Sequence, residues 1–157
     1  MNRCALVEEL HTPLIAPLAF ELFKERPYCF FLDSSMDPQK LGRYSFMGSD
    51  PFLVLSSRGR KVNLSSWGER HEIEGDPFDV LRELLMTYAL ELMDSPVPFN
   101  GGAVGYFGYD LCHFMERLPS IAVDDLHLPE CYLCLYDTVV AFDHLEGKSY
   151  VVSTGFP

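Results

Sequence analysis

The chain has 157 residues, of which 48% are hydrophobic and 13% aromatic, and its formal net charge at pH 7 is −11. This length fits a single domain over residues 1–157 with a buried core, and the composition excludes an intrinsically disordered chain. The negative charge argues against a nucleic-acid partner, because phosphate backbones would repel the chain. There is no apolar run long enough to span a membrane and no signal-peptide pattern, so we expect no membrane partner and a cytoplasmic protein.

The first predicted element is a helix over residues 13–26. Ile15, Leu18 and Leu22 recur at helical spacing and predict its apolar face, with Phe23 as a further candidate for that face. Pro27 ends the helix, because its ring removes a backbone donor and clashes with the preceding turn.

Extended segments are expected after this helix. An aromatic run predicts a strand over 28–35, and a polar run predicts a loop over 36–42. Residues 43–66 predict further strands, with turns at 48–51 and 58–59. An alternating segment over 69–74 predicts one more strand. The basic cluster Arg58, Arg60 and Lys61 is then interpreted as the flank of a hairpin turn.

The clearest predicted helix covers residues 77–93. Asp76 is a suitable N-cap and Pro77 suits the first helical position. Apolar residues at helical spacing predict one face that lies on a sheet. These residues are Phe78, Leu81, Leu84, Leu85, Tyr88 and Leu92.

The last part of the chain predicts more strands. A glycine-punctuated strand is expected over 103–109, followed by a short helix or turn and an acidic connector over 120–129. Residues 130–142 and 149–153 predict a hairpin, with Gly147 in its turn. Because strands arrive in runs rather than alternating with helices, the fold class is α+β, with a largely antiparallel sheet and flanking helices.

Five cysteines give no disulfide framework, since the count is odd and no secretory signal precedes them. Cys131 and Cys134 form a single C-x-x-C on a predicted strand, where positions three apart point to opposite faces. A zinc site would need further ligands at suitable spacing. We therefore predict buried, reduced thiols and no metal site.

Residues 99–110, FNGGAVGYFGYD, are rich in glycine but lack the pattern of a phosphate-binding loop. Either the glycines allow a close approach between backbones, or they contact a ligand directly. No serine, cysteine or histidine has the spacing of a known nucleophilic site, so no catalytic residue is predicted. The five histidines are interpreted as surface residues or as hydrogen-bonded core residues, and Asp124 and Asp125 as solvated.

A second candidate site joins Asp33, Ser34 and Ser35, at a strand end, to Arg43 and Tyr44 across a loop. A carboxylate or hydroxyl for an ammonium group, a guanidinium for a carboxylate and an aromatic wall would together suit an amino acid. Aspartate followed by serine is also ordinary turn chemistry, so both interpretations stay open.

Three segments resemble a known family. FFLDSS…GRYSFMGSDPF, then PFNGGAVGYFGYDL…ERLP, then LPECYLCLYDTVVAFDH are similar, in this order, to the N-terminal region of component I of aminodeoxychorismate (para-aminobenzoate) synthase and anthranilate synthase. The resemblance implies one lobe of a two-lobed sandwich. It also implies a C-terminal chorismate-binding domain, absent from this chain, which carries the magnesium site and the catalytic groups, and a glutamine amidotransferase partner.

The resemblance further implies a tryptophan pocket lined by Leu32, Ser34, Arg43 and Tyr44, with no cofactor held by this part of the protein. Anthranilate synthases typically read Leu-Leu-Glu-Ser at the strand where this chain reads Phe-Leu-Asp-Ser. The shorter Asp33 favours the aminodeoxychorismate branch, which leads to para-aminobenzoate and folate. The alternatives are the anthranilate branch, which leads to tryptophan, and a free-standing amino-acid-binding or interaction module.

Overall fold

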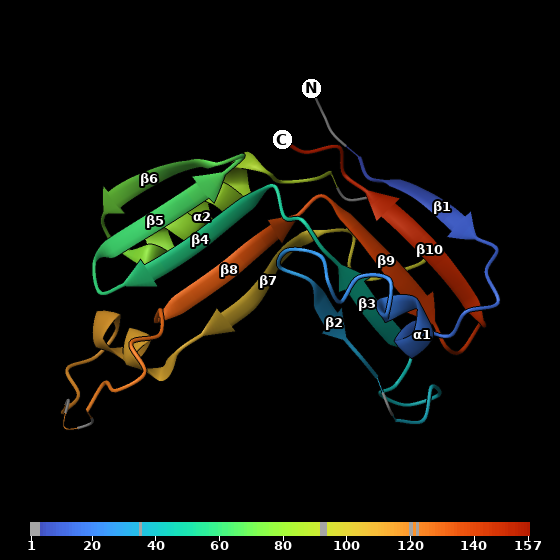
Figure 1. The fold of residues 1–157 in the computed structure, drawn as a ribbon, viewed down its shortest axis with the longest axis horizontal. Coiled ribbons are helices and arrows are strands. Elements are labelled where there is room, and N and C mark those ends of the chain that lie inside the picture. Colours follow the sequence, from blue (N-terminus) through green and yellow to red (C-terminus); the bar gives the residue numbers. More distant parts are fainter. Residues whose placement is uncertain (1–3, 35, 92–93, 120, 122) are drawn as a thin grey trace.

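The computed structural model describes residues 4–34, 36–91, 94–119, 121 and 123–157, which form two five-stranded sheets (Figure 1). Sheet A has the order β1 (Leu6–Leu10), β10 (Lys148–Ser153), β9 (Thr138–Asp143), β3 (Tyr44–Gly48), β2 (Phe30–Leu32). Sheet B has the order β6 (Glu69–Glu74), β5 (Lys61–Ser66), β4 (Leu53–Arg58), β8 (Cys131–Tyr136), β7 (Gly102–Phe107).

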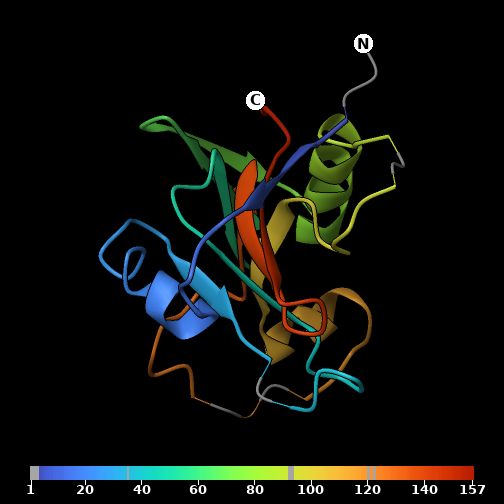
Figure 2. The same ribbon diagram turned by 90° about the vertical axis from the view of Figure 1, so that its right-hand side faces the viewer.

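The helical elements of the described residues are α1 (Ala16–Phe20), α2 (Pro77–Thr87) and the 3₁₀ helix η1 (Tyr109–Phe114). Figure 2 shows α1 and α2 on different sides of the molecule. All strand pairings are antiparallel, which confirms the predicted α+β class. Among the described residues, no helix has both the length and the apolar character needed to cross a bilayer.

Asp137 separates the two sheets. Residues 130–142 were expected to form one strand, but this segment bends at Asp137 and contributes β8 to sheet B and β9 to sheet A. The Asp137 carbonyl accepts a hydrogen bond from Thr154 N at 2.7 Å, so the bend is fixed by the residue that follows β10. As a result the two sheets spread apart like two arms (Figure 1).

Three apolar clusters stabilise this arrangement. One lies where the sheets meet and includes Tyr136 of sheet B with Val139 and Val152 of sheet A. A second packs sheet B against α2, with Leu55 and Val62 at its centre. The third packs sheet A against α1. Burial of apolar surface of this kind is the main term that stabilises a folded domain.

Helix α2 begins as its sequence predicts. The Asp76 side chain accepts a hydrogen bond from Phe78 N at 2.8 Å, and Pro77 occupies the first helical position. The helix ends at Thr87, before the predicted residue 93, and Leu92 lies outside the described residues. The predicted apolar face packs on sheet B except for Leu85, which is 47% exposed.

Helix α1 differs from its prediction in length and in orientation. It spans five residues, and turns with i→i+3 hydrogen bonds continue the chain to Arg26. Of the predicted apolar face, Ile15, Leu18 and Leu22 are exposed to solvent, whereas Phe23 packs against the core beneath sheet A. Ala16 and Ala19 are buried instead, because their small side chains let the helix approach sheet A closely.

The glycines of β7 serve close backbone packing, as one of the two interpretations predicted. A Cβ atom at Gly105 would collide with the carbonyl oxygen of Tyr132 on the neighbouring strand β8. Gly101 has a φ of 110°, and a Cβ there would lie 2.9 Å from the Tyr136 carbonyl oxygen. Side chains other than glycine would therefore push β7 away from β8.

The cysteines of the described residues are free thiols. Cys131 and Cys134 face opposite sides of β8, since Cys131 belongs to the core beneath α2 and Cys134 to the core between the sheets. Burial raises the pKa of Cys131 to about 11, so its thiol stays protonated at neutral pH. The prediction of buried, reduced thiols is confirmed for this pair.

Candidate functional site

The predicted amino-acid site lies at one end of sheet A. Strand β2 pairs with β3, with Leu32 opposite Phe46, and β3 pairs with β9, with Tyr44 opposite Asp143. The residues that follow β2 therefore lie beside those that begin β3. The structure thus brings the chain around Leu32, Ser34, Arg43 and Tyr44 together at the lower end of sheet A in Figure 1, while Ser35 lies outside the described residues.

The two faces of this sheet end differ. Because side chains alternate along a strand, Leu32, Tyr44 and Asp143 share the face that turns toward the core between the sheets. Ser45 lies on the opposite face with Met47, which packs against α1. Leu32 is 49% exposed, so an apolar side chain is accessible at this sheet end.

Ser45 is fully buried and makes three hydrogen bonds. Its Oγ donates to Asp33 Oδ1 at 2.8 Å, accepts from Ser34 N at 3.2 Å, and lies 2.7 Å from His144 Nε2. The bonds join the end of β2, the start of β3 and the turn after β9. Together with the Arg43–Asp143 pair described next, Asp33, Ser45 and His144 form what we call the strand-end cluster.

Arg43 forms an ion pair with the buried carboxylate of Asp143. Arg43 Nε lies 3.1 Å from both Asp143 oxygens, and Nη2 lies 2.7 Å from Oδ2. Asp143 Oδ1 also accepts from the backbone N–H groups of Leu145 and Glu146 at 3.0 and 3.1 Å. The guanidinium therefore already has a carboxylate partner inside the chain.

These bonds shift the pKa values of both partners. The hydrogen bond with Asp143 raises the pKa of Arg43. Burial alone would raise the pKa of Asp143, but the bonds from Arg43 and from the two backbone N–H groups outweigh it and lower that pKa below its ordinary value. The pair is thus charged at neutral pH.

Tyr44 links this sheet end to the loop before β7. Its ring lies under the Arg43 guanidinium at 4.9 Å and stacks on Phe46, which in turn contacts Phe99 edge-on. Its hydroxyl donates a long hydrogen bond of 3.4 Å to the Pro96 carbonyl. Burial, and then the negative charge of Asp143, raise the pKa of Tyr44. Tyr44 is therefore a neutral aromatic wall at this position.

The strand-end cluster contains serine, histidine and aspartate, but not in a nucleophilic arrangement. In a catalytic triad histidine lies between serine and carboxylate and takes the serine proton. Here Ser45 lies in the middle, donates directly to Asp33 and has no exposed surface. The cluster is a structural support for the sheet end.

Sequence reasoning did not find Asp143, His144 or Ser45 as parts of this site. Asp143 and His144 follow an apolar strand about a hundred positions after Arg43, and their type alone indicated only a turn. The strand pairing of β3 with β9 supplies the missing information.

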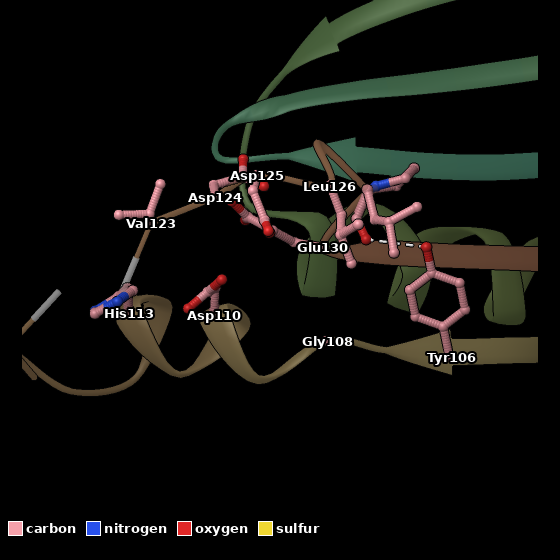
Figure 3. A pocket seen from close by; sticks show the side chains of 11 residues that line it. Tyr106, Gly108, Asp110, His113, Val123, Asp124, Asp125, Leu126 and Glu130 are labelled. Atoms are coloured by element: carbon pink, nitrogen blue, oxygen red, sulfur yellow. Dashed lines mark hydrogen bonds between the residues drawn. The ribbon is translucent and has the colours of Figure 1, made fainter. Parts of the chain in front are cut away.

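A pocket of about 430 Å³ lies at the end of sheet B, between η1 and the connector before β8 (Figure 3). Asp110 and His113 point from η1 toward the connector, which carries Asp124 and Asp125. Glu130 accepts a hydrogen bond from Gly59 N at 3.0 Å, and Tyr106 donates to the Pro129 carbonyl at 3.1 Å.

Asp124 on the connector forms an ion pair with Arg58 of the β4–β5 hairpin and accepts from His127 N. We call Arg58, Asp110, Asp124, His127 and Glu130 the connector cluster. Its central ion pair is half exposed on both sides. Within the described ranges, no three histidine, cysteine or acidic side chains come close enough together to hold a metal ion.

No protein-family model matches the chain. Anthranilate synthase component 1 of Acetivibrio thermocellus is 36% identical to it over 153 residues, which cover 96% of this chain and 31% of that protein. Anthranilate synthase component 1 of Mycolicibacterium smegmatis is 36% identical over 152 residues, covering 94% of this chain and 28% of that protein. Anthranilate synthase alpha subunit 2, chloroplastic, of Arabidopsis thaliana is 33% identical over 162 residues, which cover 96% of this chain and 26% of that protein.

A solved structure has the same fold. The crystal structure of anthranilate synthase component I from Streptococcus pneumoniae TIGR4 matches with a TM-score of 0.62 and 23% sequence identity, covering 90% of this chain and 30% of that chain. The chain spans about a third of the length of these relatives. Over almost its whole length, the chain is therefore similar in sequence to the N-terminal region of anthranilate synthase component I, and it shares the fold of the solved relative.

Proposed function

We propose that this chain is the N-terminal domain of a chorismate-aminating synthase of the aminodeoxychorismate type. The observation that carries the proposal is the extent of the likeness, which covers 96% of this chain but only 31% of a relative named anthranilate synthase component 1. In this proposal the domain supports a C-terminal domain that binds chorismate and magnesium. A glutamine amidotransferase subunit supplies the ammonia.

Asp33 is the reason for choosing the aminodeoxychorismate branch. Its carboxylate is hydrogen-bonded to the buried Ser45 on the domain's own sheet, and a glutamate would extend one methylene beyond that position. The alternative is the anthranilate branch, which the names of the three relatives favour. Both branches use the same domain architecture and differ in the position of chorismate that receives the amino group.

We further propose that the end of sheet A lines an amino-acid pocket for tryptophan. Leu32 and Tyr44 offer an apolar side chain and an aromatic ring on one face, and Ser34 and Arg43 offer polar groups beside them. The Arg43 guanidinium is engaged with Asp143 through Nε and Nη2, and Nη1 makes no hydrogen bond to the described part of the chain. We assign Nη1 to the ligand carboxylate.

Product analysis tests the branch. The full-length protein is incubated with chorismate, magnesium and ammonium, and the products are separated by chromatography. We expect 4-amino-4-deoxychorismate, which an added lyase converts to para-aminobenzoate. Anthranilate would instead establish the alternative branch, and no turnover of chorismate would reject both.

The same assay with residues 1–157 alone is a matched control for the placement of the active site. We expect no consumption of chorismate, and turnover by this chain would contradict the proposal. Calorimetry with L-tryptophan distinguishes the remaining alternative. Binding by the full-length protein but not by residues 1–157 fits a pocket completed by the other domain, whereas tight binding by this chain alone supports a free-standing amino-acid-binding module.

A further inference from the structure

The hydrogen bonds of Ser45 determine the protonation of one ring nitrogen of His144. A serine hydroxyl donates one hydrogen bond and accepts two. The Asp33 carboxylate can only accept, so the hydroxyl proton points to it, while the Ser34 backbone N–H can only donate. The third partner, His144 Nε2, must therefore carry a proton and donate to Ser45 Oγ at 2.7 Å.

Hydrogen bonds link His144 to both chain segments that line the proposed pocket, directly to the start of β3 and through Ser45 to the end of β2. Its backbone N–H donates to the Arg43 carbonyl at 2.8 Å, and its ring reaches Ser34 and Asp33 through Ser45. The preceding residue, Asp143, holds the Arg43 guanidinium. Two adjacent residues of the β9–β10 turn thus fix the end of β2 and the start of β3.

This support comes from the face of the sheet opposite to Leu32 and Tyr44. Ser45 shares its face with Met47, and it has no surface exposed to a ligand. The hydrogen bonds of Ser45 therefore act by fixing the position of the pocket residues, and Ser45 does not contact a ligand itself. Without the His144 donor, the buried Ser45 Oγ keeps only the Ser34 N–H as a donor, and the second acceptor position of this hydroxyl has no partner unless the neighbouring chain shifts. The residue free to move is Ser34, because it lies two positions beyond the last residue of β2 and outside the strand pairing.

We propose that His144 is a positioning residue for the amino-acid pocket, which it serves by donating its Nε2–H to Ser45 and so holding Ser34 in place. This inference rests on the proposed function, in which Ser34, Arg43 and Tyr44 bind tryptophan. The histidine does not touch the ligand. The proposed role requires a hydrogen-bond donor for Ser45 Oγ that lies as far from the backbone of residue 144 as Nε2 does.

Three substitutions at His144 separate a positioning role from a general structural one. In His144→Gln the side-chain amide nitrogen reaches about as far as Nε2 and can still donate to Ser45. In His144→Asn the amide nitrogen stops near the position of Nδ1, and His144→Leu has no donor. His127→Leu, at an exposed histidine of the connector cluster, is the matched control.

The first measurement is the affinity of each full-length variant for L-tryptophan by calorimetry. We expect the wild type, His144→Gln and His127→Leu to agree within about twofold, and His144→Asn and His144→Leu to bind about tenfold more weakly, which corresponds to the loss of about one hydrogen bond. Wild-type affinity in both His144→Asn and His144→Leu would overturn the proposal. Weak binding by His144→Gln as well would also overturn it, because the donor would then not be the cause.

The second measurement does not depend on tryptophan. Hydrogen exchange at the Ser34 amide of the ligand-free protein reports whether that N–H is held. We expect exchange about tenfold faster in His144→Asn and His144→Leu and unchanged in His144→Gln and His127→Leu. Unchanged exchange in the first two variants would refute the positioning role. If the wild type binds no tryptophan but these exchange rates differ as expected, the proposed ligand is wrong and the positioning of Ser34 by His144 stands.

Discussion

The two sheets each end in a cluster of carboxylates with an arginine and a histidine, and the two clusters differ in burial. In the strand-end cluster, Asp143 is 2% exposed and its partner Arg43 is 38% exposed. In the connector cluster, Arg58 and Asp124 are 50% and 51% exposed. The two clusters lie at the lower ends of the two arms in Figure 1. Similar side chains are thus placed in two different environments within one chain.

The difference follows from what each cluster connects. Arg43 and Asp143 lie at the ends of two paired strands, so the sheet itself excludes water from the carboxylate. Asp124 lies on an irregular connector, and its pair with Arg58 bridges a loop to a hairpin turn. An ion pair in solvent contributes about 0–1 kcal/mol, whereas a buried carboxylate that loses its partner costs several times more. The stability of the domain should therefore depend on only one of the two clusters.

The largest expected effect comes from Asp143→Ala. The substitution leaves the Arg43 guanidinium without its carboxylate and removes the acceptor of the Leu145 and Glu146 N–H groups. Because Arg43, which loses its partner, is more than a third exposed, we expect a loss of about 2–3 kcal/mol in the free energy of unfolding, somewhat less than for a fully buried pair. Urea unfolding measures this loss, and a value below about 1 kcal/mol would show that burial does not separate the two clusters.

A smaller effect is expected from pH. The pKa of Asp143 is lowered in the folded protein, so its carboxylate contributes stability above its unfolded pKa of about 3.9, and this stability is lost as the pH falls through the folded value. The stability difference between the wild type and Asp143→Asn should stay constant from about pH 7 to 5 and shrink as the pH falls below about 4. Urea midpoints at a series of pH values test this. If the stability difference between the two proteins does not change with pH, the charge of Asp143 is not what stabilises the turn after β9.

A second contrast, between contacts near in sequence and contacts distant in sequence, explains which parts of the structure could be predicted from the sequence. The start of α2 depends on Asp76 and its neighbour Pro77, so local rules were sufficient there. They also predicted the β4–β5 hairpin, but its two-residue turn is at 59–60, one residue after the predicted 58–59. Strand β1 was not predicted, because it lies at the edge of sheet A and pairs, within the described ranges, only with β10, about 140 residues later. The face of α1 was assigned wrongly because packing on sheet A selected small residues rather than large ones.

For the candidate site, Ser34, Arg43 and Tyr44 could be named because they lie within about ten residues of one another. Their supporting residues Asp143 and His144 lie about a hundred positions away, and only the pairing of β3 with β9 brings them close. A carboxylate and a histidine after an apolar strand are common in turns, so nothing in their local sequence distinguished them. The part of a site that touches a ligand can thus be local in sequence while its support is not.

The smallest expected effect is that of Asp124→Ala, and it completes the comparison. The substitution removes the ion pair with Arg58 and the acceptor for His127 N, but both sides of this pair are about half exposed and water can replace the lost partners. We expect a loss below about 0.5 kcal/mol in the free energy of unfolding, and an even smaller one in 1 M salt, where exposed charges are screened. Urea unfolding at low and high salt measures both values. A loss above 1 kcal/mol that persists in salt would mean that the connector is a packed part of the domain, and that exposure alone does not explain why the two clusters differ.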